Sequence, residues 1–136
     1  MKKVLLSVLC LLVITGCGCN KKEENKNNQT GNNSSIKTNT NKEFLNNQTI
    51  NGIEISNVNL SYQNEVSTFT AVVTNKLTVV KKIGIIDIVI KDENKNEIIT
   101  LKGLIDKNMK VNESASINAS TSLDLTNAKY VEYRIK

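Results

Sequence analysis

Beyond Phe44, the apolar residues of this chain recur at every second position in short runs, which is the pattern of β-strands with one buried face. No stretch of this region shows the three-to-four-residue spacing of an amphipathic helix. The pattern predicts strands over 53–62, 66–75, 82–91, 97–105, 113–121 and 130–135. Six or seven short strands at near-regular spacing indicate an all-β fold, a small β-sandwich, with a small barrel as the alternative.

The alternation also predicts which side chains face the core and where the strands end. Its phase changes between Ile55 and Val58, which predicts a β-bulge or a strand that crosses between sheets. Thr68, Thr70 and Thr74 are expected to face water. Polar residues predict turns at 63–64 and 92–96, a loop around 106–112, and a crossing segment over 123–128 with at most one helical turn. The side chains expected to point inward are those of Phe69, Ala71, Val73, Ile86, Ile88, Ile90, Ile99, Leu101, Ile105, Ala115, Ile117, Ala119, Val131, Tyr133 and Ile135.

Four apolar residues fall on the outward faces of the neighbouring strands 82–91 and 97–105. They are Ile85, Val89, Ile98 and Leu104. One interpretation is an interaction patch on the surface of the sheet. The other is that one strand is displaced by a residue, which would exchange its two faces.

The N-terminus follows a different pattern. Lys2 and Lys3 precede an apolar run from Val4 to Ile14. Eleven helical residues cover ~17 Å, against ~30 Å of bilayer hydrocarbon, so the run is too short to span a membrane. A basic start, a short apolar core and small residues before a boundary are typical of a secretory signal peptide, predicted here over residues 1–16.

The residues that end this segment, Ile14-Thr15-Gly16-Cys17, resemble the lipobox of bacterial lipoproteins. The resemblance implies cleavage between Gly16 and Cys17 and attachment of a diacylglyceryl group to the Cys17 thiol. Two acyl chains hold a protein stably on a membrane, whereas one chain binds only marginally. We therefore expect a lipid-anchored protein on the extracytoplasmic face of the cell membrane, with a soluble secreted product as the alternative. The Asn, Lys and Ile bias favours an AT-rich, Gram-positive source.

Residues 20–43 contain eight asparagines and a single large aliphatic residue, Ile36. Such a segment buries too little apolar surface to offset the entropy of ordering it. We expect a lipidated Cys17 and a disordered linker over 17–44, followed by the sandwich domain over 45–136. The linker is interpreted as a spacer, because glutamates among its lysines weaken the alternative of lipid binding. Cys19 is interpreted as a bystander in the linker and not as a redox residue.

The net charge of +5 does not indicate a nucleic-acid-binding protein. Within 45–136, ten lysines and one arginine face ten carboxylates, with no basic run. Three cysteines lie at positions 10, 17 and 19, so the domain has no disulfide. The chain has no histidine, the commonest general base, and no recognisable nucleophile motif. We expect no enzyme activity and no cofactor.

One stretch, Asp92-x-Asn94-x-Asn96, reproduces the first three oxygen positions of a calcium loop. Glu97 stands where that loop needs glycine, and Gly103 stands where it needs a bidentate glutamate. A hairpin turn is therefore the preferred interpretation, and no metal site is predicted.

From about Ile53 onward, the chain resembles the FxLYD domain and related immunoglobulin-like domains of bacterial lipoproteins. The matching stretches are Val72-Val73-Thr74-Asn75, Ile88-Val89-Ile90-Lys91-Asp92, Val111-Asn112-Glu113 and Asp124-Leu125-Thr126-Asn127-Ala128-Lys129-Tyr130. Ile88 and Lys91 occupy the places of the name-giving Phe and Tyr. The resemblance implies an immunoglobulin-like sandwich in an extracytoplasmic setting and transfers no catalytic residue.

Together these features predict a membrane-anchored lipoprotein whose sandwich binds or scaffolds another protein of the cell envelope. The alternative is a solute- or ion-binding accessory module of an envelope transport system.

Overall fold

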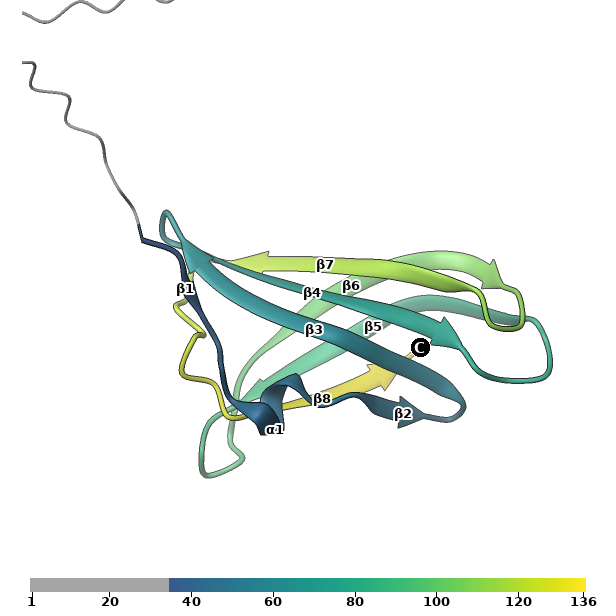
Figure 1. The fold of residues 1–136 in the computed structure, drawn as a ribbon, viewed down its shortest axis with the longest axis horizontal. Helices are drawn as coiled ribbons and strands as arrows, with labels where there is room; N and C mark the ends of the chain where they lie inside the picture. Colours follow the sequence, from purple (N-terminus) through teal and green to yellow (C-terminus); the bar gives the residue numbers. More distant parts are fainter. Residues whose placement is uncertain (1–34) are drawn as a thin grey trace, which may run out of the picture. The chain divides into compact units, whose positions relative to one another are not determined.

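The computed structural model describes residues 35–136, which fold into two antiparallel β-sheets (Figure 1). Eight strands and one short helix make up this part of the chain. In order they are β1 (Lys37–Thr38), α1 (Lys42–Leu45), β2 (Gln48–Ile50), β3 (Ile53–Gln63), β4 (Val66–Asn75), β5 (Lys81–Lys91), β6 (Glu97–Met109), β7 (Ser114–Thr121) and β8 (Tyr130–Ile135).

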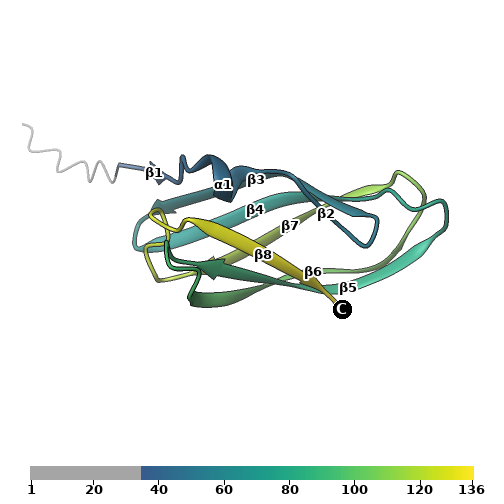
Figure 2. The same ribbon diagram turned by 90° about the horizontal axis from the view of Figure 1, so that it is seen from below.

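The larger sheet has the order β1-β3-β4-β7, and β2 also pairs with β3 beside β1. The smaller sheet has the order β6-β5-β8. Figure 2 shows the two sheets as layers, with β3, β4 and β7 in one and β5, β6 and β8 in the other. The predicted all-β, immunoglobulin-like sandwich is therefore confirmed, with two short additional strands at its N-terminal edge.

Apolar side chains from both sheets meet between the layers, as the period of two predicts. Ile86, Ile88 and Ile90 of β5 are fully buried in the core, and so are Phe69 and Val73 of β4. The other inward-facing residues expected from the alternation are all buried in this core or packed against it. Thr74 is an exception to the expected pattern, because it is buried and its hydroxyl is hydrogen-bonded to that of Ser114 at 2.8 Å.

The predicted phase change in the first long strand is a β-bulge. The register of β3 against β4 shifts between Ser56 and Asn59, and Asn57 lies in the left-handed region with φ 51°. Because of the extra residue, the Leu60 side chain points into the same core as that of Ile55, although the two residues lie an odd number of positions apart. The following turn contains Asn64 and Glu65, both with positive φ, which is the geometry of a two-residue type I′ hairpin.

One predicted connection differs from the structure, and a second agrees with it. The loop expected around 106–112 is wrong in its first half, because β6 continues to Met109, which is fully buried. The strand crosses this region by a second bulge at Asp106, whose φ is 43°. The segment 123–128 crosses between strands as expected, with a turn and no helix, and the Leu125 amide donates to Ser67 Oγ at 3.0 Å.

The predicted disordered linker is wrong for its last part, since residues 37–44 belong to the folded domain. Lys37 and Thr38 pair with the end of β3, and Asn39 Nδ2 donates to the carbonyl of Ala128 at 2.8 Å. Phe44 is fully buried, with its ring centre 6.4 Å from that of Phe69. The average composition of the segment did not indicate that it docks on the domain. One buried aromatic residue and one hydrogen-bonded asparagine attach an otherwise polar segment.

The part of the chain that follows Asn32 contains the whole buried core of the described residues. It therefore holds the elements needed to fold without the residues before Asn32. Residues 1–34, which include the rest of the predicted linker, lie outside the described part of the chain.

Replacing Phe44 by alanine tests whether this segment belongs to the domain. We expect Phe44→Ala to lower the free energy of unfolding by about 3–5 kcal/mol, because the substitution leaves a cavity beside Phe69. Ile36→Ala is the matched control, since Ile36 is 61% exposed and its loss should cost less than ~0.5 kcal/mol. Urea unfolding of residues 32–136 measures both values. If the two variants are equally stable, Phe44 is part of the linker and not of the folded domain.

Candidate functional site

The outer face of the smaller sheet exposes an apolar pair. Ile85 of β5 lies directly opposite Leu104 of β6, and their exposed fractions are 38% and 67%. Their sequence neighbours Ile86 and Gly103 point to the core side. The two strands therefore have the faces expected from their alternation, and the outward-facing pair is a true surface feature.

The other two members of the predicted patch do not join this pair. Val89 lies on the same face, in register between Thr100 and Glu132, but it is fully buried. Ile98 is 43% exposed and lies toward the other end of β6, beside the turn at Asp92. The predicted patch is thus reduced to Ile85 and Leu104.

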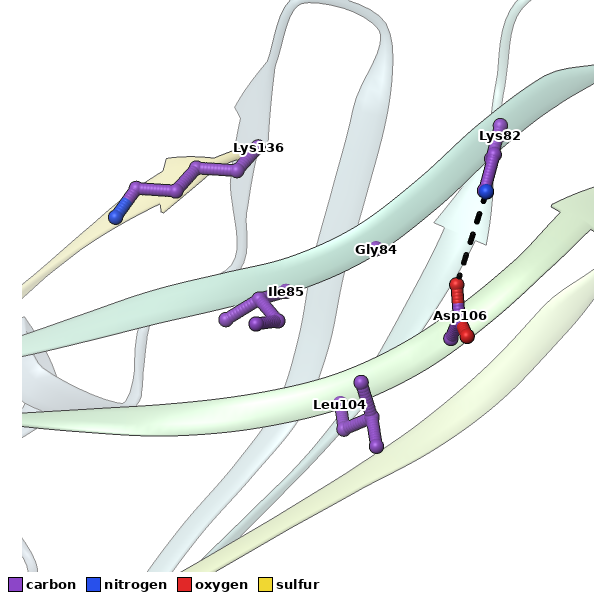
Figure 3. A pocket seen from close by; sticks show the side chains of 6 residues that line it. All are labelled: Lys82, Gly84, Ile85, Leu104, Asp106 and Lys136. Atoms are coloured by element: carbon purple, nitrogen blue, oxygen red, sulfur yellow. Dashed lines mark ion pairs between the residues drawn. The ribbon is translucent and has the colours of Figure 1, made fainter.

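A hollow of about 500 Å³ adjoins the apolar pair at the bulge between β5 and β6. The register shift between Ile83 and Ile85 sets Gly84 opposite two residues of β6, Ile105 and Asp106. Glycine adds no side chain at this point, which leaves the space open. Figure 3 shows the lining residues, which are Lys82, Gly84, Ile85, Leu104, Asp106 and Lys136.

The rim of the hollow carries both signs of charge. Lys82 Nζ and Asp106 Oδ1 form an ion pair at 3.9 Å, drawn as a dashed line in Figure 3. Both side chains are well exposed, so the pair contributes little to stability and is free to exchange partners. Lys136 enters from the end of β8, where its amide donates to the carbonyl of Ile85 at 3.0 Å.

A nearly buried carboxylate, that of Asp87, binds one of the rim lysines. Asp87 receives Lys136 Nζ at 2.5 Å and Lys102 Nζ at 3.5 Å, and only 9% of its side chain is exposed. The hydrogen bond from Lys136 outweighs the opposing effect of burial and lowers the pKa of Asp87 below its ordinary value. Asp87 therefore holds the Lys136 side chain beside the hollow. An apolar floor with a charged rim suits binding, because it offers contact area and orientation.

The candidate calcium loop is a closed hairpin turn. Asp92 Oδ1 accepts hydrogen bonds from the amides of Asn94 at 2.8 Å and Asn96 at 2.9 Å. These bonds, chiefly the one from the Asn96 amide, lower the pKa of Asp92. The three residues come together as the sequence pattern suggests, but the aspartate oxygens are used to close the turn. Within residues 35–136, no three His, Cys, Asp or Glu side chains gather in a way that could hold a metal ion.

The predicted cleavage and lipidation residues, Gly16 and Cys17, and the bystander Cys19 lie outside the described residues, so cleavage and lipidation remain predictions. Across residues 35–136 no helix has the length and apolar character needed to cross a bilayer. Sequence reasoning missed the hollow and its charged rim. A signal was present in Gly84, because an isolated glycine inside a strand pattern suggests a bulge.

Comparison with protein families, with curated proteins and with solved structures found no match for this chain.

The ion pairs of Asp87 predict a pH dependence of stability. Because its pKa is lower in the folded chain than the ordinary value of 3.8, the ionised carboxylate stabilises the fold above about pH 4. This contribution is lost as the pH falls through the lower, folded-state pKa. The stability difference between the wild type and Asp87→Asn should therefore be largest near pH 7 and shrink below pH ~4.

Urea titrations at pH 7, 4 and 2.5 measure this difference. Asp106→Asn is the control, because its exposed ion pair should contribute little at any pH. A difference between the wild type and Asp87→Asn that stays constant over the whole range would contradict the assignment.

Proposed function

We propose that this protein is a lipoprotein anchored on the extracytoplasmic face of the cell membrane, and that its sandwich binds another protein of the envelope. The binding surface is the outer face of the smaller sheet. The observation that carries the proposal is the exposed pair of Ile85 and Leu104 beside the hollow at Gly84. Single exposed apolar residues are ordinary, but two that lie opposite each other on paired strands beside a concave site favour a contact surface.

The arrangement matches the anatomy of a small protein interface. Such interfaces have an apolar centre and a polar rim that is partly open to water. Here Ile85 and Leu104 supply the centre, and Lys82, Asp106 and Lys136 supply the rim. An apolar side chain of the partner would enter the hollow, and its charged neighbours would pair with the rim. The partner therefore needs a protruding apolar residue with charges beside it.

The proposed anchor leaves this surface accessible. Residue 35 leads into β1, beside the turn between β3 and β4, whereas the hollow lies toward the opposite end of the sandwich, near the C-terminus (Figure 1). Residues 18–34 could span at most ~60 Å. The N-terminal attachment therefore joins the domain at the end away from the hollow and does not cover it.

A second candidate function is binding of a small solute, as an accessory of a transport system. The hollow of about 500 Å³ favours it, since small-molecule sites usually measure ~300–1,000 Å³. The opposite charges of Lys82 and Asp106 would suit a zwitterionic solute with an apolar part.

Substitutions on the sheet face test the proposed surface. Residues 32–136, immobilised and exposed to envelope extract, should capture a specific protein, and Leu104→Asp should reduce the capture at least tenfold by placing a charge in the apolar centre. Leu123→Asp is the control, because Leu123 is 46% exposed at the other end of the sandwich. The proposal fails if the wild type captures nothing, or if Leu104→Asp and Leu123→Asp behave alike. A thermal stabilisation by zwitterionic solutes that Leu104→Asp abolishes would establish the second function instead.

The mass of the mature protein tests the anchor. Protein purified from its host should begin at Cys17 and carry a diacylglyceryl group on that residue. Cys17→Ser should abolish the modification and move the protein from the membrane fraction to the soluble fraction, because the two acyl chains provide the attachment. A mature chain that begins elsewhere, or an unmodified Cys17, would overturn this part of the proposal without affecting the binding surface.

A further inference from the structure

Two neighbouring loops expose three valines at the end of the sandwich remote from β1. Val79 and Val80 lie between β4 and β5 and are 60% and 58% exposed. Val111 lies between β6 and β7 and is 46% exposed. Figures 1 and 2 both place these loops side by side, projecting beyond the ends of β3 and β8. We call Val79, Val80 and Val111 the valine tip.

A buried asparagine holds the two loops together. Asn75 is fully buried, and its side-chain amide donates to the carbonyls of Val79 at 2.9 Å and Met109 at 3.0 Å. Its backbone amide donates to Glu113 O at 3.0 Å, and its carbonyl accepts from the Asn112 amide at 2.7 Å. The polar groups of this scaffold are satisfied inside the domain. The valines are therefore presented on a fixed base, and their exposure does not reflect a loose loop.

Lysines surround the valine tip in excess over carboxylates. The loops and adjoining strand ends carry five lysines and three carboxylates, which are Lys76, Lys81, Lys82, Lys107 and Lys110, with Glu54, Asp106 and Glu113. The three carboxylates are already paired, with Lys76, Lys82 and Lys107. Within residues 35–136, Lys81 forms no salt bridge, and Lys110 lies beside Glu113, whose carboxylate accepts from the Lys110 amide and pairs with Lys107. The valine tip is thus flanked by an excess of two positive charges.

The opposite end of the domain has the reverse balance. In segments 35–46, 63–66, 91–97 and 121–130, six carboxylates outnumber five lysines. The positive charge that this domain carries is therefore concentrated around the exposed valines. A surface that is both apolar and basic attracts a partner that is both apolar and anionic.

We propose that the valine tip docks on an anionic lipid bilayer. The valines would enter the boundary between headgroups and acyl chains, and Lys81 and Lys110 would contact anionic headgroups. A bilayer fits better than a protein partner, because the valines lie on loops that project from the domain and are flanked by more lysines than carboxylates. The valines do not line the hollow, although Lys82 and Asp106 adjoin both surfaces, so the inference goes beyond the function proposed above.

The chain is long enough for this contact on the membrane that would hold Cys17. The 11 residues of β3, which run most of the length of the domain, measure ~36 Å. The ~60 Å that residues 18–34 could span exceeds this length. A domain anchored at Cys17 can therefore turn the valine tip toward the same bilayer. The vesicle test below uses no anchor, so it stands even if the lipidation proposal fails.

Vesicle binding of residues 32–136 tests the proposal. This part of the chain has no native cysteine, so Val111→Cys can carry a single environment-sensitive fluorophore. With vesicles of phosphatidylglycerol and phosphatidylcholine, we expect a blue shift at position 111 and cosedimentation that weakens at high salt. The same label on Leu123→Cys, at the opposite end, should not shift. Vesicles of phosphatidylcholine alone should bind at least tenfold more weakly.

Two pairs of substitutions separate the roles of the valines and the lysines. Val79→Asp with Val80→Asp, and Lys81→Glu with Lys110→Glu, should each reduce binding to anionic vesicles at least tenfold. Lys42→Glu with Lys129→Glu is the matched charge control at the other end and should change binding less than threefold. Circular dichroism confirms that each variant is folded.

Three results would overturn the proposal. They are no binding of the wild type to anionic vesicles, an equal loss in the charge control, and unchanged binding of the valine variant. A fourth pattern would identify a protein site instead. In that case an envelope protein would bind the wild type and not the valine variant, and neither form would bind vesicles. The lipid assignment would then be wrong.

Discussion

The contact of Phe69 with two other aromatic rings joins the three parts of this domain. Phe69 belongs to the larger sheet, Phe44 to the N-terminal segment, and Tyr133 to the smaller sheet. The ring centres of Phe44 and Tyr133 lie 6.4 Å and 6.3 Å from that of Phe69. The domain has no cysteine, so this packing and the strand pairing must provide its stability. The surfaces discussed above all depend on the relative position of the two sheets that this contact maintains.

The core also contains a buried polar group. The Tyr133 hydroxyl is buried and has no hydrogen-bond partner among residues 35–136. Burial raises its pKa well above the ordinary value of 10.0, so the group stays neutral at any physiological pH. Its ring packs in the core, and it does not line the hollow at Gly84. We interpret Tyr133 as a packing residue.

Bulges and turns decide where the surfaces form. The bulge at Asn57 keeps both halves of β3 facing the core. The bulge at Gly84 and Asp106 opens the hollow beside Ile85 and Leu104. Asn75 links the loops that carry the exposed valines. In each case the backbone departs locally from a regular strand. The departure brings together surface side chains that a regular strand would keep apart.

The sequence by itself determined the six longer strands, the faces of most of them and the approximate positions of the hairpin turns, because these follow from the local period of two and from turn-forming residues. The N-terminal prediction at Cys17 is likewise a property of adjacent residues. Only the tertiary structure decided that residues 37–44 belong to the domain, that β6 continues to Met109, and that Val89 is covered. It also decided which exposed residues meet, Ile85 with Leu104 and the valines of two separate loops. These outcomes depend on contacts between residues far apart in the chain, such as Asn39 with Ala128, and the local pattern of a strand does not specify its partners.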